Sequence, residues 1–77
     1  MPEIGRKESA ILRVLGQHNV PLGAAAIARE LKSYGIELTE RAVRYHLQIM
    51  DERGLTEQVG REGRIITERG RHEIGAH

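Results

Sequence analysis

One segment, residues 39–55 with the sequence TERAVRYHLQIMDERGL, constrains the fold more than any other part of the chain. Thr39 suits the N-cap of a helix, because its hydroxyl oxygen accepts a hydrogen bond from a free backbone amide. Gly54 suits the C-terminal end of the helix, because glycine adopts a positive φ without strain. The apolar residues between them recur at helical spacing. The segment is therefore predicted to form one amphipathic helix.

The two sides of this predicted helix differ in chemistry. At about 100° per residue, the apolar side carries Val43, His46, Leu47 and Met50, with Ala42 and Ile49 on its shoulder. The opposite side carries Arg41, Arg44, Tyr45, Gln48 and Glu52. Arginine, tyrosine and glutamine donate hydrogen bonds to phosphate oxygens and base edges, so this side is a candidate surface for a DNA major groove. Simple solvation is the alternative, because charged outer faces are usual on amphipathic helices.

Length and composition exclude several classes of protein. The chain has 77 residues, enough for one small domain and one core but not for an enzyme with a separate substrate domain. It has no cysteine, which excludes disulfides and thiolate metal sites and leads us to expect a cytoplasmic protein. No apolar stretch approaches the roughly 20 residues that span a bilayer, and no signal peptide is visible. We therefore expect no membrane partner.

Charge says less about the partner than the type of cation does. Twelve Lys and Arg against eleven Asp and Glu give a formal net charge of +1, which does not by itself indicate nucleic acid. Ten of the twelve cations are arginine, whose planar group makes bidentate contacts with phosphate and guanine. With two tyrosines and no Phe or Trp, the chain lacks the stacking surface of single-strand binders.

Two further helices are predicted before this segment. Residues 6–17 carry apolar side chains at helical spacing, and residues 24–34 are rich in strong helix formers and end before Gly35. Between them, Pro21 favours an extended link, because proline lacks an amide donor and biases its predecessor away from helix. A short edge strand fits this link.

A hairpin and a short helix are predicted after the segment. Residues 55–59 and 64–67 are β-prone runs joined by a loop whose two glycines, Gly60 and Gly63, allow positive φ. Thr67 resembles a second N-cap and opens a short helix that reaches residue 74.

This order of elements predicts an α+β, mainly α, winged helix-turn-helix: three helices, a two- to three-stranded β-hairpin wing and a short C-terminal helix. We expect one domain over residues 1–77, with an ordered core of about residues 7–74.

Particular motifs resemble known families. The pattern I-A-x-x-L at residues 27–31, followed by L-T-x-R-A-V-R-Y-H-L-x-x-M-x-x-x-G-L at residues 38–55, is similar to bacterial and archaeal winged-helix repressors. R-A-V-R-Y-H-L, D-E-R-G-L-T, a G-R-x-G wing and I-T-E-R-G most resemble the N-terminal domain of the archaeal nitrogen-regulon repressor family and the related ribonuclease R winged-helix domain. Such proteins continue into effector-sensing and dimerising regions. The resemblance thus implies an N-terminal fragment of a larger regulator, or an unusually short relative.

The resemblance implies a sequence-specific double-stranded DNA-binding module of a transcriptional repressor, with a link to nitrogen assimilation genes. It assigns the DNA contacts to Thr39, Glu40, Arg41, Arg44, Tyr45, Gln48, Arg61 and Arg64. The first six lie on the third helix, whose N-terminal part meets base edges, and Arg61 lies in the wing, which reaches the minor groove. Arg64 is the weaker wing candidate. We expect a homodimer on a two-fold operator, formed through a region outside this chain.

Several alternatives stay open. Glu40 lies one turn before Arg44, so these two residues can pair with each other. His46 is predicted to be a partly buried histidine with a backbone partner, and His18, His72 and His77 show no metal-binding spacing, so we predict no metal and no cofactor. No nucleophile–base pattern indicates an enzyme. The rival functions are an RNA-associated module and a protein-interaction or dimerisation module.

Overall fold

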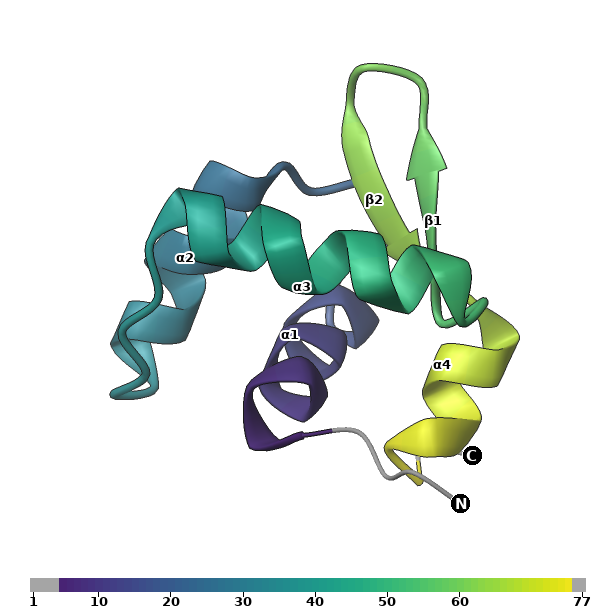
Figure 1. Cartoon of the computed structure of the whole chain (residues 1–77), viewed down its shortest axis with the longest axis horizontal. Helices are drawn as coiled ribbons and strands as arrows, with labels where there is room; N and C mark the ends of the chain where they lie inside the picture. Colours follow the sequence, from purple (N-terminus) through teal and green to yellow (C-terminus); the bar gives the residue numbers. More distant parts are fainter. Residues whose placement is uncertain (1–4, 76–77) are drawn as a thin grey trace.

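Across residues 5–75, four helices and one hairpin make up the fold. The computed structural model describes residues 5–75, so residues 1–4 and 76–77 of the predicted domain, His77 among them, lie outside the described range. The elements, drawn in Figure 1, are α1 (Arg6–Gly16), α2 (Ala24–Ser33), α3 (Glu40–Glu52), β1 (Thr56–Val59), β2 (Gly63–Ile66) and α4 (Glu68–Glu73). The predicted order of elements is confirmed, and each predicted boundary agrees within one residue.

The three long helices enclose a single apolar core. In Figure 1, α3 runs across the molecule, with α1 below it, α2 behind its N-terminal half and the hairpin standing near its C-terminal half. The buried apolar side chains are Ile11, Leu12, Val14, Leu15, Ala24, Ile27, Leu31, Val43, Leu47, Met50, Leu55 and Ile66. Most of them come from the predicted apolar sides of the helices, so packing holds α3 with its other side outward. No helix within residues 5–75 has the length and apolar character to cross a bilayer.

The hairpin is joined by a third extended segment. β1 and β2 pair antiparallel with Thr56 opposite Ile66 and Val59 opposite Gly63. Leu22 then pairs with Arg64 through two backbone hydrogen bonds, of 3.0 Å and 2.9 Å. The predicted edge strand in the link before α2 is therefore confirmed as a single bridge.

Both threonine caps take the predicted positions. Thr39 Oγ1 accepts a hydrogen bond from the Ala42 amide at 3.0 Å, and Thr67 Oγ1 accepts one from the Gly70 amide at 3.0 Å. The Thr67 hydroxyl also donates to the Gly54 carbonyl at 2.6 Å, which ties α4 to the turn after α3. Each cap satisfies an amide that has no partner inside its helix.

Replacing Thr39 by alanine should lower the free energy of unfolding by about 1 kcal/mol, because the Ala42 amide loses its acceptor. Urea denaturation followed by circular dichroism measures this difference. Thr39→Ser keeps the hydroxyl and should retain most of the stability. Equal losses for the two variants would contradict a capping role.

The predicted backbone partner of His46 is wrong. The side chain is partly buried, as expected, but its Nδ1 lies against Oε2 of Glu8 and makes no other contact with a polar group among residues 5–75. The first turn of α1 passes beside α3, so a carboxylate distant in sequence occupies the place where a carbonyl was expected. The Tyr45 ring packs edge-on against His46, with ring centroids 5.4 Å apart.

Candidate nucleic-acid interface

The outward side of α3 presents a continuous polar surface. Arg41, Arg44, Tyr45 and Gln48 are all exposed, and Tyr45 keeps 61% of its surface in solvent. They lie opposite Val43, Leu47 and Met50, the buried side chains of the same helix. The predicted division of α3 into two sides is therefore confirmed. An exposed tyrosine with two arginines and a glutamine offers donors for phosphates and base edges.

The two arginines of this surface differ in their surroundings. Arg44 Nη2 lies 3.4 Å from Glu40 Oε2, with 60% and 42% of the two side chains exposed. This is the i,i+4 pair anticipated from the sequence, and an exposed pair of this kind contributes at most about 1 kcal/mol. Arg41 has no hydrogen-bonding or ionic partner within residues 5–75. Neither arginine is therefore strongly held by the protein.

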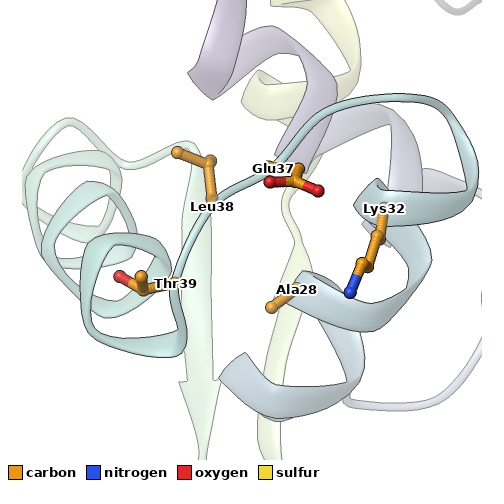
Figure 2. Close-up of a pocket in the computed structure, with 5 residues that line it drawn as sticks. All are labelled: Ala28, Lys32, Glu37, Leu38 and Thr39. Atoms are coloured by element: carbon orange, nitrogen blue, oxygen red, sulfur yellow. The ribbon is translucent and has the colours of Figure 1, made fainter.

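A shallow depression lies where the chain enters α3. It has a volume of about 250 Å³ and is lined by Ala28, Lys32, Glu37, Leu38 and Thr39. Figure 2 shows the Lys32 side chain extending from α2 towards the gap beside the turn that leads into α3. The depression thus places a cation beside the N-terminal end of α3. No sequence pattern singled out Lys32, because a lysine within a helix-forming run carries no sign of its position in space.

The two arginines of the hairpin take different positions. Arg61 is exposed in the loop between β1 and β2 and has no ionic partner in the described part of the chain. Arg64 instead turns towards α3, with its Nη2 and Nε donating to Asp51 Oδ2 at 2.8 Å and 3.0 Å. Only 16% of the Arg64 side chain is exposed. The two wing candidates therefore differ, because Arg61 extends from the loop and Arg64 is held against α3 by Asp51.

Asp51 is a site residue that the sequence did not suggest. Its Oδ1 accepts a hydrogen bond from the Thr56 hydroxyl at 2.5 Å, in addition to the bonds from Arg64. Thr56 is only 3% exposed, so the carboxylate satisfies a buried hydroxyl. An aspartate near the end of a helix has no local pattern that identifies such partners. Only the register of the hairpin brings Thr56 and Arg64 to it.

The remaining ionisable groups do not gather into a metal site. Across the described residues, no three His, Cys, Asp or Glu side chains are placed to share a metal ion. His18 Nε2 lies 2.8 Å from Glu30 Oε2, which joins the end of α1 to α2. This histidine is explained by a structural contact.

The helix-turn-helix of α2 and α3 and the antiparallel hairpin after it define a winged helix-turn-helix domain. A family model described as the ribonuclease R winged-helix domain matches residues 9–74. The chain belongs to that family. The similarity to this domain, anticipated from the sequence motifs, is confirmed.

Individual relatives carry regulator names. The chain is 49% identical over 73 residues to the global nitrogen regulator NrpRI of Methanosarcina mazei, and 47% identical over 74 residues to the global nitrogen regulator NrpR of Methanocaldococcus jannaschii. These matches cover 95% and 96% of this chain but only 23% and 14% of the relatives. The chain thus spans less than a quarter of the length of these curated relatives. The resemblance to the nitrogen-regulator family is confirmed.

A solved structure supports the fold. A chain in the complex structure of hsRosR-S1 superimposes with a TM-score of 0.77 at 26% sequence identity. The match covers 92% of this chain and 66% of that chain. The predicted winged-helix architecture is therefore confirmed by both a family model and a known structure.

Proposed function

We propose that this chain is the sequence-specific double-stranded DNA-binding module of a transcriptional regulator, a repressor of nitrogen assimilation genes. The observation that carries the proposal is the outward side of α3, where Arg41, Arg44, Tyr45 and Gln48 are exposed on a helix whose other side is buried. The names of the relatives, global nitrogen regulators, support the biological role. Binding rather than catalysis is the activity that these side chains suit.

In this proposal α3 enters the major groove with its N-terminal half. Arg41 and Arg44 meet phosphates or guanine, Gln48 meets a base edge, and the Tyr45 hydroxyl donates to a phosphate. Thr39 and Glu40 lie at the entering end of the helix, where helix-turn-helix proteins approach the bases. Lys32, beside that end, adds a cation suited to a phosphate.

The wing completes the proposed interface. Arg61, exposed in the loop of the hairpin, would occupy the neighbouring minor groove, where a narrow A·T-rich tract attracts arginine. The ion pair with Asp51 supports a structural role for Arg64, so Arg64 is not among the proposed direct contacts with DNA.

The proposal extends to the assembly. One α3 covers only a few base pairs, so tight binding requires two copies on two-fold-related half-sites. The greater length of the relatives supports a dimerising region outside this chain, and a role in gene regulation supports a cytoplasmic location. A module over residues 1–77 would then be one part of a larger regulator.

An NMR titration tests the proposal. The isotope-labelled chain is titrated with a mixed-sequence DNA duplex at low and high salt, and with an RNA duplex of the same sequence. Non-specific binding has a Kd of about 10⁻⁴ to 10⁻⁶ M, so millimolar duplex is needed. We expect salt-sensitive shifts at residues 39–48 and at Arg61, larger with DNA than with RNA.

Other outcomes would replace the proposal. Stronger binding to the RNA duplex would favour the RNA-associated module. Base recognition by α3 would then be ruled out, because the deep, narrow major groove of A-form RNA excludes the helix. The absence of shifts with either duplex would favour a protein-interaction module.

A further inference from the structure

One carboxylate joins the last full turn of α3 to both strands of the wing. Asp51 lies near the C-terminal end of α3, Thr56 begins β1, and Arg64 lies in β2. Thr56 donates to Asp51 Oδ1 at 2.5 Å, while Arg64 donates to Oδ1 at 3.2 Å and to Oδ2 at 2.8 Å and 3.0 Å. With 28% of Asp51 and 16% of Arg64 exposed, these charge-assisted bonds are largely shielded from water.

The contacts continue from Asp51 towards the loop of the wing. Arg64 lies directly opposite Gln58 across the hairpin, and its Nη2 is 3.5 Å from Gln58 Oε1. Gln58 Nε2 then donates to the carbonyl of Gly60 at 3.1 Å. Gly60 is the residue before Arg61. A chain of side-chain contacts therefore runs from α3 to the neighbour of the exposed wing arginine.

The backbone alone holds the wing less firmly. The hairpin has four residue pairs and one bridge to Leu22, and an isolated two-stranded hairpin is at best marginally stable in water. The bridge to Leu22 fixes β2 near the end remote from Ile66, and Ile66 is itself buried in the core. Asp51 adds hydrogen bonds and an ion pair that join both strands of the wing to α3.

We propose that Asp51 is a positioning residue that sets the wing relative to α3, so that Arg61 engages the minor groove while α3 occupies the adjacent major groove. The inference rests on the proposed function. Asp51 itself makes no DNA contact. Its carboxylate acts through Arg64 and Gln58. Loss of this carboxylate should weaken the contribution of Arg61 to DNA affinity and leave the contribution of α3 unchanged.

Whether loss of the Asp51 charge weakens or strengthens DNA binding distinguishes a positioning role from a simple effect of charge. Removing a negative charge beside DNA favours binding, because repulsion of the phosphates falls. A positioning role predicts the opposite for Asp51. Glu52, the next residue, is exposed at the same end of α3 and has no ionic partner in the described chain, so Glu52→Gln is the matched control for the change in charge.

The test compares two 24-base-pair duplexes, one with an A·T tract and one with a G·C tract in its place, by fluorescence anisotropy at low salt. Wild-type chain should prefer the A·T duplex about tenfold, which corresponds to about 1.4 kcal/mol. Asp51→Asn and Arg61→Ala should each remove this preference, and Asp51→Asn should add nothing in the Arg61→Ala background. Glu52→Gln should keep the preference and bind both duplexes slightly more tightly.

A second variant and a DNA-free measurement guard against loss of folding. Arg64→Lys keeps the positive charge but loses the forked contact with Asp51, so it should also reduce the A·T preference. In the free protein, ¹⁵N relaxation should give wild-type order parameters for residues 40–52 in both variants. The order parameters of the amides of residues 60–63 should fall below about 0.6, the range of flexible backbone.

Two results would overturn the inference while the proposed function stands. The first is a wild-type chain that binds through α3 with equal affinity for both duplexes. The second is an Asp51→Asn variant that keeps the A·T preference and the wild-type order of the wing. If no duplex is bound, or if binding is insensitive to Arg41 and Arg44, the proposed function itself fails, and the inference fails with it.

Discussion

Alanine in place of Gly63 should lower the free energy of unfolding by about 2–6 kcal/mol, a large part of the stability of so small a domain. Gly63 has a φ of +132°, which L side chains rarely adopt. A Cβ there would fall on the backbone carbonyl group of Leu22 and lie 2.7 Å from the amide nitrogen of Gly23. The clash is with backbone, which cannot rotate away as a side chain can. Relief requires that the bridge between Leu22 and Arg64 separate.

Gly60 provides the matched control. It lies in the loop that ends at Gly63 and has a φ of +52°, and no atom lies within 4 Å of the position that a Cβ would take. Gly60→Ala should therefore cost only the left-handed backbone penalty, about 1–2 kcal/mol. Urea denaturation followed by circular dichroism gives both differences. Similar losses for the two variants would show that close approach to Leu22 contributes nothing.

The two glycines illustrate how far the sequence predicts the wing. Their spacing between two β-prone runs indicated a hairpin with positive φ, and both residues have it. The proline link before α2 indicated an edge strand. No local pattern indicated that Leu22 would lie against Gly63, because the two are 41 positions apart and meet only when the hairpin folds back onto the link. Local backbone requirements were predictable, and the tertiary contact was not.

The side-chain contacts divide in the same way. Thr39 and Thr67 bond to amides three residues later, so their sequence context was sufficient to predict both caps. His46 contacts Glu8 from α1, and Asp51 contacts Arg64 across the hairpin. Those partners depend on how helices pack and on strand register. Arg64 was therefore predicted as a wing contact with DNA, and its ion pair with Asp51 of α3 was not anticipated.

The candidate DNA surface was predictable as a surface. A helical period near 3.6 residues decides which side chains of α3 face the core, and Val43, Leu47 and Met50 are buried as predicted. The same period leaves the arginines outside without deciding what they touch. Exposure follows from packing, whereas recognition depends on a partner, so the contacts of α3 require a binding measurement.

Replacing both Arg41 and Arg44 by alanine should weaken duplex binding about 100-fold while leaving the fold intact. Each arginine in contact with DNA contributes about 1–3 kcal/mol, and every 1.4 kcal/mol is tenfold in affinity. Neither side chain contributes much to stability, because both are exposed and the only ion pair that they make within residues 5–75 is the exposed one of Arg44 with Glu40. Loss of Arg44 also leaves Glu40 without its cation, which adds repulsion of the phosphates.

The dependence on salt distinguishes contact from general charge. Each lost phosphate contact makes the slope of log K against log salt less steep by about 0.9. The slope of the double variant should therefore be less steep than that of the wild type by up to about 1.8. The control is Arg6→Ala with Arg13→Ala, which removes the same charge from exposed positions of α1. That pair should change affinity only slightly and leave the slope unchanged, because α1 lies on the other side of α3 from the proposed surface. Equal losses for the two pairs would mean that DNA senses the net charge of the domain rather than the side chains of α3.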